Sequence, residues 1–376
     1  MIAGAAMPER EAETIDQDIP LVDPPKRYIA MPDSTTFLES ACHNPNFRPH
    51  SVFVPVSADS DPEASGLYEV DLRTDTVTKR CALPKEGLYF GCKLSDAGVC
   101  YLCVGNQGKV LAIDLGDDTK APEAQTFVDL PGSFQPNDIA IDARHDGGAG
   151  RLLIACNDQV YDVLSTRGQT LNALRIAGKK DGAVFSAKLD QPGPATELVS
   201  GMRVLAGSVV VPGDGPAGTL WLSELNNLIR VPLDDPKAWE RVSPFPPELL
   251  ADNMETAGTE VLFPYYRVVS SVEEEIMTRS WISRVLYGAL RWLPDKLFNK
   301  LFGDPPPPGQ ASDTFEDVCY GRYDFVSKEM ISHRIDITNK GFDGHCTAME
   351  RVGTDLVFIN YLEKEILVVD ASKLLG

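Results

Sequence analysis

The sequence predicts an all-β protein of the propeller type with one helical interruption, and three observations support this. Short β-rich runs, such as Ser51–Val56 and Thr219–Ser223, follow one another between Gly, Asp, Asn and Pro residues. Similar phrases of a polar turn and a β-rich run recur every 40 to 50 residues or so, the period of propeller blades. The pattern breaks between Val272 and Gly303, where apolar residues fall at helical spacing.

The length and composition favour one large folded unit. The chain has 376 residues, of which 43% are hydrophobic, so it can bury a substantial core. Residues 1–27 are acidic and contain proline, and we expect a flexible arm there. Residues 28–376 are predicted to form a single propeller domain that includes a helical insert at 272–303 and a Pro-rich loop at 304–313.

The charge balance excludes some classes of partner. With 35 Lys and Arg against 55 Asp and Glu, the formal net charge is −20. Such a field repels nucleic acid and anionic membranes, so we expect no nucleic-acid partner and consider membrane contact unfavoured. No apolar run has the length of a membrane span.

The cysteines and the termini bear on the cellular compartment. The chain has eight cysteines, and the close couple Cys100 and Cys103 falls on opposite faces of a predicted strand. We therefore expect buried free thiols, with a single bridge as the alternative. Because no basic leader and no Asn-x-Ser/Thr acceptor occurs, a cytoplasmic location is predicted, with secretion as the alternative if a leader is missing.

Two polar corners precede strand-like runs. Pro136-Asn137-Asp138 leads into an alternating run, and Asp252-Asn253 forms a comparable corner. Asn and Asp at such corners either bond the local backbone as an Asx-turn or offer oxygen ligands to a hard cation such as calcium. The recurrence of the corner favours a site.

The helical interruption has three possible roles. Its first turn is acidic and its later residues are basic, and Asp304–Gly309 ends it because successive prolines cannot continue a helix. It can cap the propeller, close over the tunnel mouth as a lid, or contact a membrane. The lid is favoured because the insert follows the Asp252-Asn253 corner, and the membrane is the least favoured because of the net charge. The candidate membrane contacts are Trp281, Trp292, Phe298 and Phe302.

Together these stretches resemble a known superfamily. The run Phe134–Asp142, the run Gly218–Leu233, the Ala251–Met254 corner and the Trp- and Leu-rich insert look like the strictosidine-synthase-like branch of the superfamily that also holds paraoxonases, gluconolactonase/regucalcin (SMP-30) and diisopropylfluorophosphatase. The likeness extends from about Tyr28 to the C-terminus. It implies a six-bladed β-propeller with calcium in its central tunnel, whose ring closes by pairing strands from the two chain ends.

The resemblance also implies the residues of a metal site. On the positions that match, the calcium ligands are expected to be Glu39, Asn137, Asp252 and Asn253. Carboxylates and amides are the oxygen ligands that calcium prefers. Ser200 stands where relatives often have Asn, and this weaker ligand predicts a looser, water-completed or vacant site.

The catalytic bases of these relatives are not clearly present. Phe90 stands where a paraoxonase-like His is expected, and Thr347 stands where strictosidine synthase has its glutamate. His345 and Asp252 are therefore the candidate catalytic residues, since an imidazole near neutral pH can act as a general base. A structural role for His345 is the alternative. The candidate substrate-binding residues are Phe90, Ser200, Tyr265, Thr347 and Trp281.

The function that follows is a calcium-dependent hydrolase of a lactone or ester, with a small apolar organic substrate in the central tunnel. One alternative is a repurposed propeller that catalyses cyclisation or another C–C or C–O bond formation in natural-product biosynthesis, without metal or base. The other is a non-catalytic propeller that binds a ligand or protein.

Overall fold

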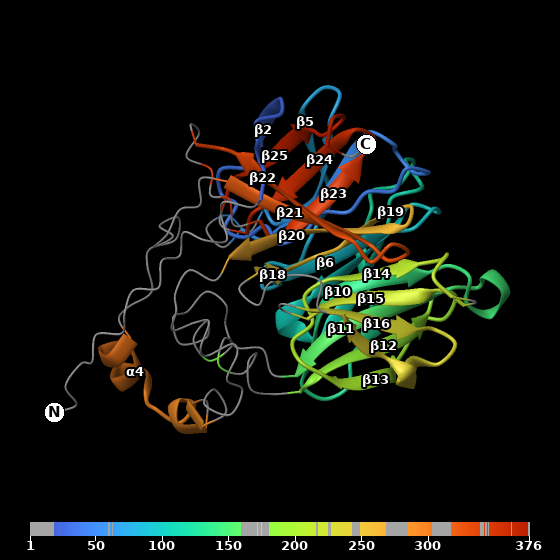
Figure 1. The fold of residues 1–376 in the computed structure, drawn as a ribbon, viewed down its shortest axis with the longest axis vertical. Helices are drawn as coiled ribbons and strands as arrows, with labels where there is room; N and C mark the ends of the chain where they lie inside the picture. Colours follow the sequence, from blue (N-terminus) through green and yellow to red (C-terminus); the bar gives the residue numbers. More distant parts are fainter. Residues whose placement is uncertain are drawn as a thin grey trace.

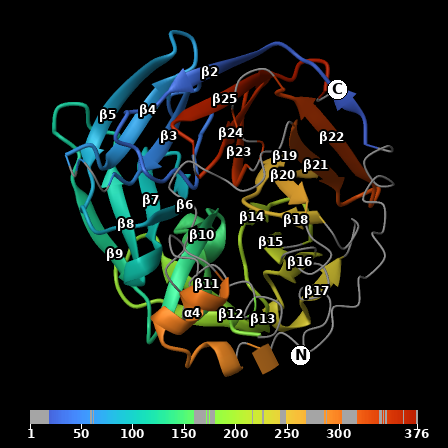
Figure 2. The same ribbon diagram turned by 90° about the vertical axis from the view of Figure 1, so that its left-hand side faces the viewer.

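The computed structural model describes most of the chain from Ile19 to Leu374. The ranges outside the described residues are 1–18, 59–60, 62, 159–170, 172–173, 175–179, 216, 225–226, 243–248, 268–284, 287, 303–316, 339–341, 343, 345, 362 and 375–376. The described strands form six sheets arranged around a centre, antiparallel except for one short parallel pair, and this is the six-bladed propeller that the sequence predicts (Figure 2).

The first three blades follow the chain order, each running from an inner to an outer strand. The first consists of an inner segment that bridges Phe37 to Ser57 and Cys42 to Phe53, followed by β3 (Ser51–Val56), β4 (Gly66–Asp71) and β5 (Thr76–Ala82). The second consists of β6 (Tyr89–Leu94), β7 (Val99–Val104), β8 (Lys109–Asp114) and β9 (Ala124–Asp129). The third consists of β10 (Phe134–Asp142), β11 (Arg151–Asp158), β12 (Gly182–Lys188) and β13 (Thr196–Met202).

The second half of the ring is less regular. The fourth blade consists of β14 (Ser208–Val211), β15 (Thr219–Glu224), β16 (Asn227–Pro232) and β17 (Glu240–Val242). The fifth has a split inner strand and consists of β18 (Leu249–Ala251), β19 (Glu255–Ala257), β20 (Glu260–Arg267), β21 (Asp317–Asp324), β22 (Met330–Asp336) and β1 (Leu21–Val22), the last pairing in parallel. The sixth consists of β23 (Ala348–Val352), β24 (Asp355–Ile359), β25 (Glu365–Asp370) and β2 (Lys26–Ala30).

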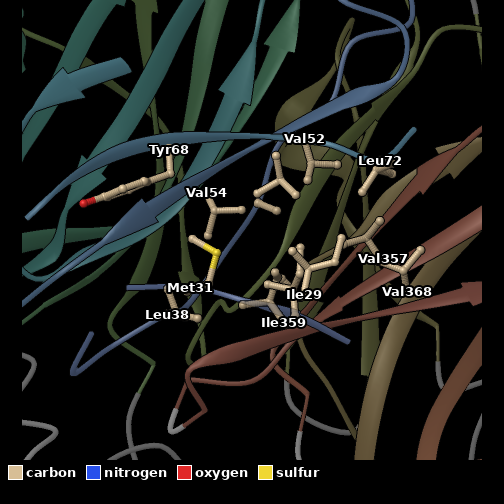
Figure 3. Packing of buried hydrophobic residues seen from close by; sticks show 14 of the residues in the cluster. Ile29, Met31, Leu38, Val52, Val54, Tyr68, Leu72, Val357, Ile359 and Val368 are labelled. Atoms are coloured by element: carbon tan, nitrogen blue, oxygen red, sulfur yellow. The ribbon is translucent and has the colours of Figure 1, made fainter. Parts of the chain in front are cut away.

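The ring closes through β2, which pairs antiparallel with β25 and so joins the two ends of the chain. Behind this seam lies a hydrophobic cluster shared by the sixth and first blades (Figure 3), to which β2 contributes Ile29, β3 contributes Val54, and β25 contributes Val368. Because β2 begins at Lys26, the predicted boundary between a flexible arm and the domain at residue 28 lies inside a strand.

Side chains alternate between the two faces of each strand, and this alternation decides which hydrophobic cluster each residue joins. Cys100 and Cys103 belong to different hydrophobic clusters, as expected for opposite faces of β7. All eight cysteines are buried and free, in agreement with the prediction from their spacing. No described helix is long and apolar enough to cross a membrane.

The helical insert lies on one face of the ring. Its described part includes helical residues between 285 and 290 and the helix α4 (Asp295–Phe302), which stands apart from the sheets in Figure 1 and on the near face in Figure 2. Leu290 packs against Leu171 and Leu174 of the β11–β12 connection. Leu171 and Leu174 are helical, and their spacing of three residues suits one face of a helix. The Pro-rich loop at 304–313 is outside the described residues.

Candidate functional site

Corner residues from all six blades lie around one end of the central tunnel. Neighbouring inner strands contact one another in turn around the ring, and irregularities in β6 and β10 mark the corners of the second and third blades. A β-bulge bends its strand and re-aims the side chains there, so it can direct polar groups toward the centre of the ring. In blade order the corner residues are Glu39, Gly91, Asn137 with Asp138, Gly207 with Ser208, Asp252 with Asn253, and Thr347.

Hydrogen bonds join three of these corners directly. The Thr347 hydroxyl donates to the Glu39 carbonyl over 3.0 Å, and the Asn253 backbone N–H donates to the Thr347 carbonyl over 3.1 Å. The Asn253 side-chain NH₂ donates to the same Glu39 carbonyl over 3.3 Å. The amide orientation of Asn253 is therefore fixed, and its Oδ1 faces away from these partners.

Two glycines allow the remaining corners to meet. A Cβ added at Gly91 would lie 2.1 Å from Asp138 Oδ1, and one at Gly207 would lie 2.5 Å from the Asp252 carbonyl. Glycine is therefore required at both positions for close backbone approach. The Ser208 N–H and hydroxyl donate to Asp138 Oδ2 over 2.6 and 3.0 Å, so Asp138 is held by the fourth blade.

Burial is the main cause that raises the pKa of three acidic side chains at these corners. Burial, together with the charge of Asp138, raises the pKa of Asp252 to about 7. Burial raises the pKa of Asp138 to about 6, although the charge of Lys93 and hydrogen bonds from Ser208 act in the opposite direction. Burial and the charges of Asp252 and Asp138 raise the pKa of the half-buried Glu39 well above its usual value. The charges of Asp138 and Asp252 therefore act on neighbouring carboxyl groups, and a bound cation would offset them.

The oxygen atoms that point into this site include two without partners. Asn137 Oδ1 and Asn253 Oδ1 are buried and have no hydrogen-bond partner. Buried carbonyl oxygens are rarely left unpaired, because the desolvation costs about 1–3 kcal/mol each. Amide oxygens beside the Glu39 and Asp252 carboxylates are the donor set that calcium takes, so the residues present fit this ion.

This donor set is a mixed one. Among the described residues, no group of three or more His, Cys, Asp or Glu side chains has the arrangement of a metal site. The fit therefore depends on the two asparagines as much as on the carboxylates. A hard cation accepts that combination, whereas zinc and other soft metals prefer His and Cys.

Deeper in the tunnel, a buried lysine joins three blades. Lys93 Nζ on β6 lies 3.3 Å from Glu255 Oε2 on β19 and 3.4 Å from Glu350 Oε1 on β23. It also donates to the Met254 carbonyl over 3.3 Å. Burial would lower the pKa of Lys93, but the charges of Glu350 and Glu255 outweigh it and raise that pKa well above its usual value. Lys93 therefore stays positively charged, and its charge acts on Asp138.

An aromatic wall flanks the corner site. Phe37, two residues before Glu39, packs edge-on against Phe90 with ring centroids 5.7 Å apart, and its centroid lies 6.2 Å from that of Tyr361. Phe90 is the residue before the corner glycine Gly91. Phe37 and Phe90 are buried in a hydrophobic cluster against which Tyr361 packs, so the core beside this corner is apolar.

The structure brings some of the predicted site residues together and places others away from the site. Glu39, Asp252, Asn253 and Thr347 lie together at the corner site, and Asn137 is next to Asp138 in the corner of the third blade. The prediction for Ser200 is wrong, because it lies exposed on the outer strand β13 and bonds Glu197 over 2.7 Å.

Tyr265 packs in the core between the fourth and fifth blades, which explains its burial without contact with the site. In the fourth blade, Ala206 precedes the corner residues Gly207 and Ser208, and its methyl side chain has no oxygen that could bind a metal. Trp281 and His345 are outside the described residues.

Sequence reasoning missed the participation of Lys93, Ser208 and Glu350. Each is a polar residue in a short inner strand where an apolar residue would be expected, and this was the signal available. The convergence itself depends on the closure of the ring, which brings together Lys93 and a glutamate 257 positions later in the chain.

Comparison with known proteins supports the fold. No protein-family model matches the chain, and no curated protein matches it. Among solved structures, regucalcin from Agrobacterium tumefaciens, a calcium-binding protein, is 14% identical with a TM-score of 0.54 and covers 93% of this chain and 95% of its own. A gluconolactonase from Xanthomonas campestris is 9% identical with a TM-score of 0.51, over 92% and 89% of the two chains. The chain therefore shares the propeller fold of the superfamily that its sequence resembles.

Proposed function

We propose that this chain is a calcium-dependent hydrolase that acts on a lactone or ester with an apolar substituent. The observation that carries the proposal is the convergence of six blade corners on two unpartnered amide oxygens and two carboxyl groups of raised pKa. The similarity in fold to a calcium-binding protein and to a gluconolactonase supports it.

The residues that would hold calcium are Glu39, Asn137, Asp252 and Asn253. When bound, the ion would polarise a carbonyl oxygen and favour negative charge on it during hydrolysis. Asn253 is held by hydrogen bonds to Glu39 and Thr347, so its oxygen needs no rearrangement for binding.

The chain's own groups account for substrate placement and proton movement. Phe37 and Phe90 would bind the apolar part of the substrate and exclude water from one side of the site. Burial and the charge of Asp138 raise the pKa of Asp252 to about 7, and bound calcium would lower this pKa and keep the carboxylate charged as a ligand. His345 stays a predicted base and Trp281 a predicted substrate contact.

A hydrolysis panel tests the proposal. Aryl esters and lactones with alkyl or aromatic substituents are offered to the protein before chelation, after EDTA and after calcium is restored. We expect turnover to fall at least tenfold with EDTA and to return with calcium. Asp252→Asn should reduce kcat at least a hundredfold, whereas Ser200→Ala, a change on the outer strand, should leave it within twofold. Turnover that is unchanged by both EDTA and Asp252→Asn would refute the proposal.

One observation favours a second candidate, cyclisation of an apolar intermediate. Phe90 occupies the place where the resemblance expects a histidine base, and its ring is part of the aromatic wall. An apolar site without a base can still accelerate ring closure by holding a reactive conformer. A protein that is inactive on the whole panel but binds hydrophobic polyenes or other linear natural-product precursors at the tunnel would support this candidate. Phe90→Ala should then weaken that binding.

A further inference from the structure

The exposed apolar residues of this protein are concentrated in the helical insert. Of the seven large hydrophobic side chains that are exposed among the described residues, four lie between positions 285 and 297. Trp292 is the most exposed at 75%, and single exposed apolar side chains elsewhere are ordinary. The four residues are Val285, Leu286, Trp292 and Leu297.

The opposite side of the insert packs against other parts of the chain. Phe298 in α4 is fully buried, and Leu290 packs against Leu171 and Leu174 from the third blade. Phe298, one of the candidate membrane contacts, is therefore not available to lipid. The exposed apolar side chains are the outer surface of a segment whose inner surface is already covered.

Basic side chains accompany this outer surface. The Arg291 guanidinium lies 4.9 Å from the centre of the Trp292 ring, and Lys296 and Lys300 are exposed one turn apart on α4. Tryptophan and aliphatic side chains flanked by Lys and Arg are typical of helices that lie in the interface of a bilayer.

We propose that the surface formed by Val285, Leu286, Trp292 and Leu297 with Arg291, Lys296 and Lys300, here called the insert face, docks on an anionic phospholipid bilayer. The net charge of −20 does not forbid this, because charges beyond a Debye length of about 8 Å are screened at physiological salt. Local basic charge therefore decides the attraction, and each Lys or Arg near an anionic surface contributes about fivefold in affinity.

The insert leaves the ring at the mouth that holds the corner site. The last residue of β20, Arg267, pairs with Leu249, which precedes the Asp252 corner along the inner strand. β11 ends at the same side, because Asp158 pairs with Phe134 upstream of Asn137. Docking would turn the tunnel mouth toward the lipid, where apolar compounds partition. Docking itself does not depend on the proposed hydrolase activity.

Vesicle co-sedimentation tests the proposal on the full chain. Vesicles of phosphatidylcholine alone are compared with vesicles that also contain phosphatidylserine, at low and physiological salt. We expect binding to the anionic vesicles, with a blue shift of tryptophan emission, and at least tenfold weaker binding to the neutral ones. Trp292→Ser with Leu297→Ser should remove the binding, and Lys296→Gln with Lys300→Gln should weaken it by about 25-fold.

A matched control uses exposed apolar residues outside the insert. Val326→Ser with Ile331→Ser removes two exposed hydrophobic side chains from the fifth blade and should leave vesicle binding unchanged. Sedimentation velocity of each variant shows whether it is folded and whether it associates. Absence of wild-type binding to anionic vesicles, or equal binding by Trp292→Ser/Leu297→Ser, would overturn the proposal. A dimer that this double variant abolishes, without vesicle binding, would assign the insert face to self-association instead.

Discussion

Replacement of Lys93 by methionine is the sharpest test of how the tunnel is held together. The ammonium group joins β6 to Glu255 on β19 and Glu350 on β23, and the side chain of Glu350 is only 4% exposed. Burial raises the pKa of Glu350 well above its usual value even though Lys93 opposes the rise. At Glu255 burial acts in the same direction, but the charge of Lys93 together with hydrogen bonds from Glu350 and Thr256 lowers the pKa. Methionine retains most of the apolar stem but removes the ammonium group, and so leaves the buried Glu350 and the half-buried Glu255 without their shared cation.

The expected loss is large. Removing one partner of a buried ion pair costs about 3–5 kcal/mol, because the other charge stays buried without compensation. With an unfolding entropy of about 2.1 cal/mol/K per residue, this corresponds to a fall in Tm of roughly 4–7 °C for a chain of this size. Lys93→Met with Glu350→Gln should recover part of the loss, because the double change removes a carboxylate together with its partner.

Urea and thermal unfolding of the four members of this cycle measure these quantities. Lys120→Met is the matched control, because Lys120 is 80% exposed and pairs with Asp117 on the surface, where an ion pair contributes about 0–1 kcal/mol. A loss below about 1 kcal/mol for Lys93→Met, or a double variant no more stable than the single one, would refute the assignment of a buried three-blade ion pair.

Two further changes test the fold. His333 stacks on Tyr320 with ring centroids 5.1 Å apart, both its ring nitrogens are buried without a hydrogen-bond partner, and burial lowers its pKa. Because His333 takes up a proton more readily in the unfolded state, the free energy of unfolding should fall as pH drops below about 6.5. In urea titrations, His333→Phe should lose less stability between pH 8 and pH 5 than the wild type. An unchanged pH dependence would contradict the reasoning. Ile29→Ala at the closing seam should cost about 2–5 kcal/mol in urea unfolding, against less than about 0.5 kcal/mol for Leu21→Ala on an exposed edge; equal costs would show that the seam is not a packed core.

Local signals were sufficient for the fold and for part of the site. Strand periodicity and recurring turns predict the blades because each strand is defined by its own alternation and its own turn residues. Asn137 and Asp252 could be identified because the Asx corner recurs in the sequence. In the structure Asn137 lies at the bulge within β10, and Asp252 directly follows β18. Ser200 could not be placed correctly, because it belongs to the outer strand β13 of the third blade, whereas the inner strand of the fourth blade begins at Ser208.

Contacts across the ring required the structure. The Lys93 pairing with Glu255 and Glu350 joins residues from three blades, and no local pattern in sequence connects them. The wall of Phe37, Phe90 and Tyr361 likewise combines the first, second and sixth blades. Such convergence is a property of ring closure, which depends on pairing between the chain ends.

The central claim is that the corner site binds calcium, and equilibrium dialysis against radioactive calcium tests it most directly. The account predicts one bound ion per chain, and a stability gain of about 2.7 kcal/mol at a free concentration one hundred times Kd. Asn137→Ala and Asn253→Ala should each weaken binding by tenfold or more, whereas Ser200→Ala should not change it. Absence of bound calcium in folded wild-type protein, or binding that is unaffected by both asparagine changes, would contradict the account.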